Sequence, residues 1–296
     1  MSDNKNITPI WSRGINFKVY GLDNKIKYDV LLKNLKHYRG DVLQQKEGWL
    51  TDNPYLKTED ENIASFIYTR FRRDAGASRV EGHDVYVPES ISCNFHFEEK
   101  LIIVSTANDS KLNYLVEKKI FDTIRSLTDP YGCNYKPDFL FWLAYKYDID
   151  GKKITNDIKV TDITAISSER EKFNLTDAVT ANTEVTNHIE AKILLALYGF
   201  ANGARLKINM NKKDYNLKLS ADGRISATPG VNIDTKEDKA LYALNIHHII
   251  QKCYEEYSKD KKLEWDNNKK NYRQSLLKDI VKSLSSLFED FDESTE

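Results

Sequence analysis

The clearest pattern of apolar and polar positions lies between Gly199 and Ala227. In Leu206–Met210 and Leu217–Leu219, apolar residues alternate with lysine or asparagine. Such alternation at a period of two is typical of a strand that buries one face. Asp222-Gly223 is a turn signal that precedes a third short apolar run. The stretch is therefore predicted to be a three-stranded antiparallel meander with one solvent-exposed face.

Strands are predicted at four other places. Ile15–Tyr20 alternates cleanly, Val42–Leu50 carries a shorter pattern, and Asp84–Thr106 contains three runs of which the last is wholly apolar. Ile158–Ile166 follows a hairpin turn signal. Thr176–Thr183 is polar and is predicted to be a loop.

Helices are predicted where apolar residues recur at intervals of three and four. In chain order they cover Ile26–Tyr38, Ile63–Phe71 after a capping box at Thr58–Glu61, Leu112–Leu127, Val185–Leu197 before Gly199, Tyr242–Tyr257, and Tyr272–Phe288. β-branched residues before Glu190, such as Val185 and Ile189, equally allow a strand to begin there. Phe139–Tyr145 is a buried element whose pattern does not distinguish helix from strand.

These elements predict an α+β protein in which antiparallel sheets with flanking amphipathic helices form two lobes. The strong turn at Asp129–Gly132 marks the division, giving lobes at 1–130 and 131–258. Residues 259–296 are expected to form a charged linker (Lys259–Lys270, which includes Trp265), an amphipathic helix and an acidic tail. The apolar stripe of that helix is wide enough to dock on the rest of the chain or to pair with a second copy.

Composition restricts the class of protein. The 296 residues are 30% charged, yet the formal net charge is only -1, which excludes a globally basic nucleic-acid binder but not a local basic face. The three cysteines are far apart and form no disulfide or zinc pattern. No leader-like or membrane-spanning run of apolar residues occurs, so a cytoplasmic location is expected.

Cations on the wet face of the meander form a candidate DNA-binding surface. They are Arg205, Lys207, Lys212, Lys213, Lys218 and Arg224. Such a surface would contact phosphates without reading bases, although the solvated face of an ordinary sheet has the same pattern. A second candidate comprises Arg70, Arg72 and Arg73, which are expected near the end of a helix together with Arg79. Each of these guanidinium groups could donate two hydrogen bonds to a phosphate, or the arginines could simply complement the helix dipole.

Catalytic and metal-binding motifs are sparse. Pro137-Asp138 with Glu190-Ala191-Lys192 fits a Mg²⁺-dependent nuclease, in which two carboxylates hold the metal and the lysine steadies developing charge. The common hydrolase, NTPase and dinucleotide-binding motifs do not occur. Potential metal ligands crowd only at His83-Asp84, Cys93 and His96, while His247-His248 diverge on a helix. We expect no cofactor, except Mg²⁺ if the nuclease arrangement forms.

Part of the C-terminal third resembles the RexA family of phage-exclusion proteins. The resemblance rests on Gly223-Arg224-Ile225-Ser226-Ala227, the long helix to Cys253-Tyr254, and Glu190-Ala191-Lys192. It implies a dimeric, cytoplasmic DNA-binding protein of a prophage or antiphage system that acts as sensor for a membrane effector. The extension Lys259–Glu296 departs from the family pattern. The expected function is therefore sequence-independent DNA binding within phage exclusion; the alternatives are a nuclease and a protein-binding regulator.

Overall fold

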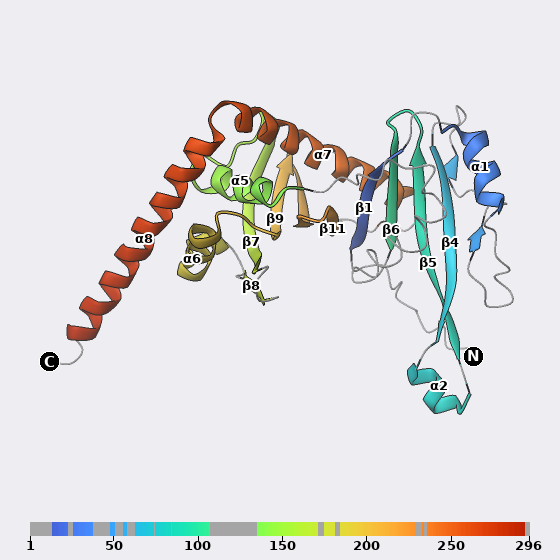
Figure 1. The fold of residues 1–296 in the computed structure, drawn as a ribbon, viewed down its shortest axis with the longest axis horizontal. Coiled ribbons are helices and arrows are strands. Elements are labelled where there is room, and N and C mark those ends of the chain that lie inside the picture. The colour runs from blue at the N-terminus through green and yellow to red at the C-terminus, as the bar shows by residue number, and fades with distance from the viewer. Residues whose placement is uncertain are drawn as a thin grey trace, which may run out of the picture. The chain divides into compact units, whose positions relative to one another are not determined.

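The computed structural model describes most of the chain. The described residues are 14–22, 26–37, 48–50, 56–57, 63–73, 75–83, 85–106, 135–170, 175–180, 184–228, 233 and 236–293. The helix predicted at Leu112–Leu127 and the start of the strand predicted at Val42–Leu50 lie outside these residues. Within them the protein is α+β with antiparallel pairing, which confirms the predicted fold class (Figure 1).

The chain divides into two compact units. The first contains Met1–Cys133 and Val231–Leu244, and the second contains Asn134–Gly230 and Asn245–Glu296. The sequence placed its division in the same region as the Cys133–Asn134 boundary. The units differ from the predicted lobes in two ways: 231–244 belongs to the first unit, and 259–296 is part of the second.

The first unit is built on an antiparallel sheet with strand order β2-β4-β5-β6-β1. Its elements are β1 (Ile15–Gly21), α1 (Tyr28–His37), β2 (Gly48–Leu50), β3 (Leu56–Lys57), β4 (Ile63–Arg73), α2 (Ala75–Glu81), β5 (Tyr86–His96) and β6 (Leu101–Thr106). The short β3 also pairs with β4. Alternate side chains such as Phe66 and Phe95 form the core, in which their rings pack edge to face. The strands predicted at Ile15–Tyr20 and within Asp84–Thr106 are thus confirmed.

The helix predicted at Ile63–Phe71 was wrong, because this segment is strand β4. All eleven residues of β4 pair with β5, from Ile63 opposite His96 to Arg73 opposite Tyr86. Ala64, Phe66 and Tyr68 enter the apolar core at a period of two, a pattern that the small Ala64 and the equally buried Ser65 conceal in the sequence. Non-local pairing therefore outweighs the helical spacing.

The second unit contains a sheet with strand order β11-β10-β9-β7-β8. Its elements are α5 (Pro137–Asp148), β7 (Ile158–Arg170), β8 (Leu175–Thr180), a 3-10 turn at Val185–Asn187, α6 (Ile189–Tyr198), β9 (Gly203–Met210), β10 (Lys213–Ser220), β11 (Arg224–Thr228), the part of α7 (Lys236–Leu263) from Asn245 onward, and α8 (Trp265–Glu293). The predicted meander is confirmed as β9, β10 and β11. The loop predicted at Thr176–Thr183 was wrong up to Thr180, because these polar residues pair with β7 as strand β8.

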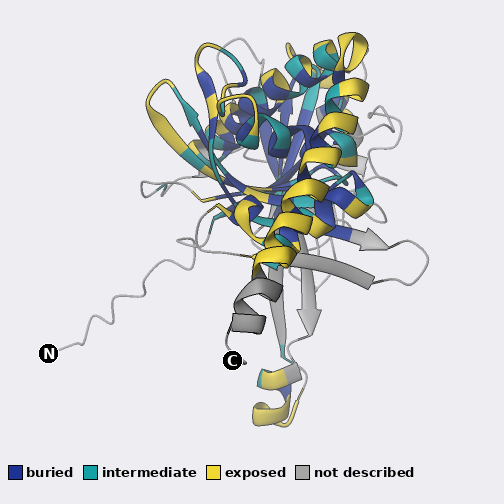
Figure 2. Cartoon of the chain, turned by 90° about the vertical axis from the view of Figure 1, so that its left-hand side faces the viewer, coloured by how far each residue is buried: buried dark blue, intermediate teal, exposed yellow. Residues whose placement is uncertain are grey.

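Helix α5 forms the centre of the second unit's core. Phe139, Leu140, Phe141, Trp142 and Leu143 are each at most 1% exposed. A helix that is apolar on all sides has no amphipathic period, which is why the sequence left helix and strand open here. In Figure 2 the buried residues concentrate in the strands and in the helix faces turned toward them.

Helices α7 and α8 replace the predicted charged linker. Helix α7 continues to Leu263, and α8 begins at Trp265 after the single residue Glu264. Tyr257 and Trp265 are 1% and 0% exposed, so two large aromatic rings anchor this junction in the core. The predicted terminal helix is confirmed, and it docks on its own chain through Tyr272 and Leu276.

Helix α6 ends as its sequence predicts. Gly199 follows it with φ +63°, and the Gly199 backbone N–H donates to the carbonyl of Leu195. A residue with φ in this range closes the last helical turn with little strain only if it is glycine. Within the described part of the chain, no helix is both long and apolar enough to cross a membrane.

Candidate nucleic-acid interface

The three meander strands separate an apolar face from a basic face. On β9, Leu206 and Ile208 are buried, while Arg205 is exposed and Lys207 is half-buried. The antiparallel register sets Lys218 of β10 directly opposite Arg205. Because directly opposite residues in a sheet lie on one face, these cations share the wet side. Arg224 of β11 also alternates away from the buried residues of its strand.

Strand β7 adds a cation that the sequence analysis missed. Lys159 is exposed and lies opposite Asn209 of β9, so it is on the same face as Arg205 and Lys207. The alternation Ile158-Lys159-Val160 was visible in the sequence, but nothing local indicated that β7 pairs with β9. We define the basic sheet face as Lys159, Arg205, Lys207, Lys218 and Arg224.

Carboxylates lie beside two of these cations. Asp214 Oδ2 is 2.9 Å from Lys207 Nζ, and Asp222 Oδ2 is 2.7 Å from Arg224 Nε. The hydrogen bonds from Asn209 and Lys207 lower the pKa of Asp214, so this carboxylate is charged at neutral pH. Both ion pairs are partly exposed to water and are therefore weak. A phosphate can compete with Asp214 for the Lys207 ammonium.

The structure places Lys212 and Lys213 away from the middle of the basic sheet face. Asn211 and Lys212 have φ of +51° and +66° and form the two-residue turn between β9 and β10. Lys213 precedes Asp214 and alternates to the opposite face, where its ammonium lies over the Tyr215 ring at 5.5 Å from the centroid. Lys212 is thus in the turn at one end of the basic sheet face, and Lys213 is on the opposite face of the sheet.

The arginines assigned to a helix end belong instead to a strand. Arg70, Arg72 and Arg73 are in β4 of the first unit, where Arg70 is opposite Glu89 in the register with β5. Arg79 is exposed on the separate helix α2. The helix terminus on which this candidate depended does not exist, because β4 pairs along its whole length.

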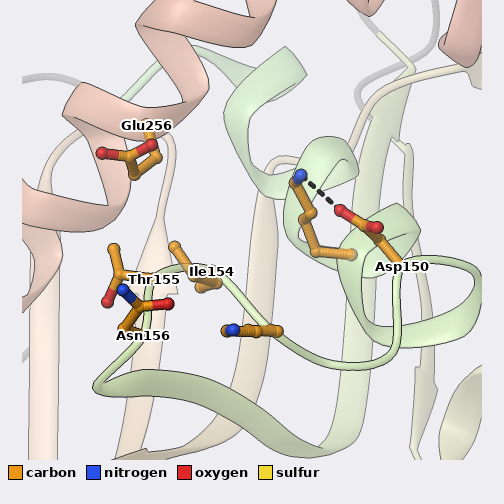
Figure 3. Close-up of a pocket in the computed structure, with 7 residues that line it drawn as sticks. Asp150, Ile154, Thr155, Asn156 and Glu256 are labelled. Carbon is orange, nitrogen blue, oxygen red and sulfur yellow. Dashed lines mark hydrogen bonds and ion pairs between the residues drawn. The ribbon is translucent and has the colours of Figure 1, made fainter.

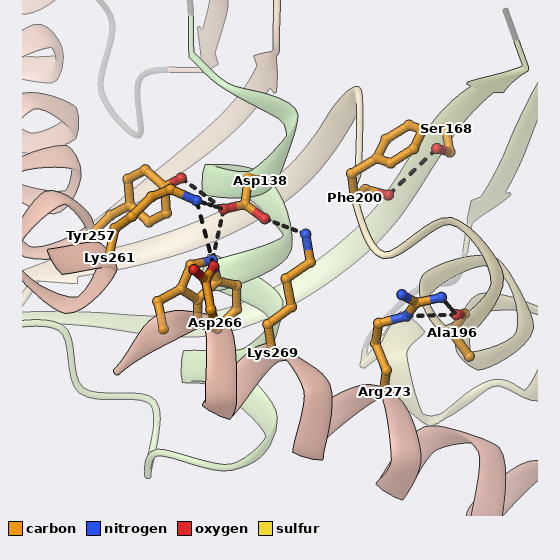
Figure 4. A network of polar contacts seen from close by, with 10 residues as sticks. Asp138, Ser168, Ala196, Phe200, Tyr257, Lys261, Asp266, Lys269 and Arg273 are labelled. Carbon is orange, nitrogen blue, oxygen red and sulfur yellow. Dashed lines mark hydrogen bonds and ion pairs between the residues drawn. The ribbon is translucent and has the colours of Figure 1, made fainter. Parts of the chain in front are cut away.

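Asp138, at the start of α5, is surrounded by donors from α7 and α8 (Figure 4). Its carboxylate accepts hydrogen bonds from Tyr257 Oη at 2.8 Å and Trp265 Nε1 at 2.7 Å. It also accepts from Lys261 Nζ at 3.0 Å and Lys269 Nζ at 2.5 Å. Four donors therefore converge on one carboxylate and join three helices. We call these five residues the Asp138 cluster.

The electrostatics of the cluster keep Asp138 ionised. Burial alone would raise its pKa, but the hydrogen bonds from Lys269, Lys261, Trp265 and Tyr257 lower the pKa to about 2. Burial, followed by the hydrogen bond to Asp138, raises the pKa of the Tyr257 hydroxyl. Three of these donors contact Oδ2 and one contacts Oδ1, so a metal ion would compete with them for the carboxylate.

The other two residues of the nuclease arrangement are on α6. Glu190 is exposed in the first turn of this helix, and Lys192 Nζ lies 2.8 Å from Asp279 Oδ2 of α8. The described contacts thus join Asp138 to α7 and α8, and Lys192 to α8, rather than to each other. The Mg²⁺-dependent nuclease stays a prediction that these contacts do not favour.

The potential metal ligands that the sequence groups together lie in strand β5 and just before it. Cys93 and His96 are both buried in β5, whereas His83 is exposed and its Nδ1 is 3.1 Å from the carbonyl oxygen of Glu81. Burial strongly raises the pKa of the Cys93 thiol, which favours its neutral form. No group of three potential metal ligands occurs among the residues that the structure describes, to which Asp84 does not belong.

A hollow of about 440 Å³ opens between α5, α7 and the segment before β7 (Figure 3). It is lined by Lys146, Asp150, Lys153, Ile154, Thr155, Asn156 and Glu256. The Lys146 ammonium is 2.5 Å from Asp150 and 3.0 Å from Asp260. Since both carboxylates already neutralise this lysine, the hollow offers an anion little net attraction.

Comparison with known proteins adds no family assignment. The chain matches no protein-family model, and no curated protein matches it significantly. The basic sheet face rests on strand pairing alone, which aligns its cations on one side of the sheet.

Proposed function

We propose that this protein binds duplex DNA without sequence preference through the basic sheet face, as a self-associating sensor of a phage-exclusion system. The observation that carries the proposal is the alignment of Lys159, Arg205, Lys207 and Lys218 on one face of three paired strands. Lysine and arginine side chains on an exposed sheet face can contact phosphate oxygens, and such contacts carry no sequence information. Binding of this kind depends on charge and not on sequence.

The cellular part of the proposal has a separate basis. The resemblance of Gly223–Ala227 and the following helix to RexA-family proteins supports phage exclusion, a cytoplasmic location and a membrane effector as partner. Strand β11, which carries part of that resemblance, pairs with β10 and contributes Arg224 to the basic sheet face, and helix α7, which carries another part, buries Ile249, Ile250 and Cys253.

The direct test compares DNA affinity in wild type and in a triple variant that carries Arg205→Gln, Lys207→Gln and Lys218→Gln. All three side chains are outside the core, so we expect the fold to persist. Each phosphate contact removed should lower the slope of log affinity against log salt by about 0.9, and three should lower it by ~2.7. Fluorescence anisotropy on a labelled duplex at about 50 and 200 mM salt measures both affinity and slope.

The matched control removes three exposed lysines elsewhere, through Lys252→Gln, Lys262→Gln and Lys270→Gln on α7 and α8. This variant has the same net charge as the basic-face variant and should bind almost as wild type does. Equal losses in both variants would indicate a general charge effect and contradict the proposed surface. Two duplexes of different sequence and equal length should bind alike.

Removing the carboxylate beside Lys207 should strengthen binding. Asp214→Asn removes the ion pair at 2.9 Å and leaves the Lys207 ammonium available to a phosphate. One fewer repulsive charge and one more phosphate contact predict an affinity gain of roughly 3- to 10-fold at low salt. The same anisotropy titration measures it. Asp266→Asn, an exposed carboxylate at the start of α8, is the control and should have little effect.

A further inference from the structure

Helix α8 presents two different faces. Its inner face docks on its own chain: Tyr272, Leu276 and Ile280 are buried, and Arg273 donates to the carbonyl of Ala196 at 2.8 and 3.0 Å. The side chains from 281 to 286 are all exposed. In Figure 1, α8 continues past α6 toward the C-terminus. The last part of α8 therefore extends beyond the elements on which the helix docks.

The outer face of α8 carries an apolar stripe. Leu277, Val281 and Leu284 are 47%, 63% and 42% exposed. The sequence continues the same spacing at Phe288 and Phe291, which makes the intervals four, three, four and three residues. This repeat of 3.5 residues is the spacing of a coiled-coil seam, whereas a stripe that faces a single straight surface follows 3.6. We call these five positions the outer seam.

The charges beside the outer seam favour one orientation of a partner helix. Lys278 flanks its first half and Asp292 flanks its second half, at equivalent heptad positions, while Lys282, Glu289, Asp290 and Glu293 lie farther from the seam in the sequence pattern. A parallel copy would place the acidic ends side by side, where like charges repel. An antiparallel copy places Lys278 of each chain near the acidic end of the other, beside Asp292.

We propose that the outer seam pairs with the outer seam of a second copy of this chain in an antiparallel coiled coil. A register that sets Val281 opposite Phe291 and Leu284 opposite Phe288 also brings Lys278 beside Asp292 of the other copy. In this orientation the docked halves of the two α8 helices lie at opposite ends of the seam. The inference rests on the self-association in the proposed function and does not require DNA binding.

The seam is short, so the dimer should depend on concentration. Four layers of side chains bury less than the roughly 1,200–2,000 Å² of a typical stable interface. Sedimentation equilibrium of the full chain should give 34.3 kDa at low concentration and approach twice that mass as concentration rises. Val281→Ser with Leu284→Ser should remain monomeric at all concentrations. Because both side chains are exposed in the free chain, the circular dichroism spectrum should not change.

The matched control is Leu263→Ser, which makes the same change at a leucine that is 82% exposed at the end of α7. It should dimerise as wild type does. A chain that is monomeric up to ~100 µM, or a dimer that the seam variant does not weaken, would overturn the proposal. An unidentified protein bound to the seam of the monomer would also count against a second copy as its occupant.

Charge exchange tests the orientation. Lys278→Glu and Asp292→Lys should each weaken the dimer, and the combined variant should restore it, because the two positions meet only across the antiparallel pair. Single losses without recovery would exclude this register. Measuring DNA affinity on the seam variant separates the two proposals: each monomer keeps its basic sheet face, so dimer formation and DNA binding can fail independently.

Discussion

Trp265→Ala is expected to destabilise the second unit by roughly 3–5 kcal/mol, the usual cost of truncating a buried tryptophan. The Trp265 side chain is fully buried, and its ring packs against Phe141 and Tyr145 at centroid distances of 6.0 and 5.4 Å. Its Nε1–H donates to Asp138 at 2.7 Å. The substitution therefore leaves a cavity between α5 and α8 and also removes one donor from the Asp138 cluster.

Urea unfolding followed by circular dichroism measures this loss. Trp265→Phe keeps most of the packing but not the hydrogen bond, so its effect should be intermediate. Leu263→Ala, two residues earlier and 82% exposed, should change the free energy of unfolding very little. If Trp265→Ala were as stable as Leu263→Ala, the α7–α8 junction would not be anchored as described.

The second large effect is expected for Asp138→Asn. The amide keeps the size of the side chain but removes the negative charge that Lys261 and Lys269 share. Hydrogen bonds to a charged group contribute more than neutral ones, so we expect a loss of about 2–3 kcal/mol at about pH 7. Asp138 has a folded-state pKa of about 2, below its usual value of 3.8.

The sign of the pH dependence follows from that depressed pKa. The stability that Asp138 contributes is complete above its unfolded-state pKa and is lost as the pH falls from about 4 toward 2. Wild type and Asp138→Asn should therefore differ most at about pH 7, differ roughly half as much at about pH 3, and converge only near or below pH ~2. Urea unfolding at several pH values tests this. A difference that stays constant down to pH ~2 would contradict the ionised cluster.

Asp148 at the other end of α5 is the control for this experiment. Burial raises its pKa, although the hydrogen bonds from Tyr272 and Thr186 act in the opposite direction. A carboxyl with a raised pKa contributes most stability at low pH and loses it as the pH rises through the folded-state value. Asp148→Asn should thus change the pH dependence with the opposite sign.

The positions at which sequence interpretation failed share a physical cause. Ile63–Phe71 has helical spacing, but its pairing with β5 joins residues far apart in the sequence. Lys259–Lys270 is so rich in charge that it resembles a solvated linker. Two of its lysines instead share the carboxylate of Asp138, which is more than 120 residues away. Local pattern carries no information about such distant partners.

The basic sheet face also combines residues that local pattern predicts with residues that only strand pairing places there. Arg205, Lys207 and Lys218 follow from strand alternation and a short turn, because alternation within a hairpin is a local property. Lys159 lies on the same face only because β7 pairs with β9. Lys213 lies on the opposite face because the turn consists of Asn211 and Lys212, so that Lys213 is the first residue of β10. A shift of one residue at a turn moves a side chain to the other face.

By itself the sequence determined the α+β class, the β9–β11 meander, and helices α6, α7 and α8, because the periods of two and about 3.6 and the turn residues that specify them are local. Only the tertiary structure decided that β4 is a strand, that Trp265 is buried, and that Asp138 accepts hydrogen bonds from two lysines and two aromatic residues. Those features depend on pairing and on buried charge, whose partners are distant in the chain.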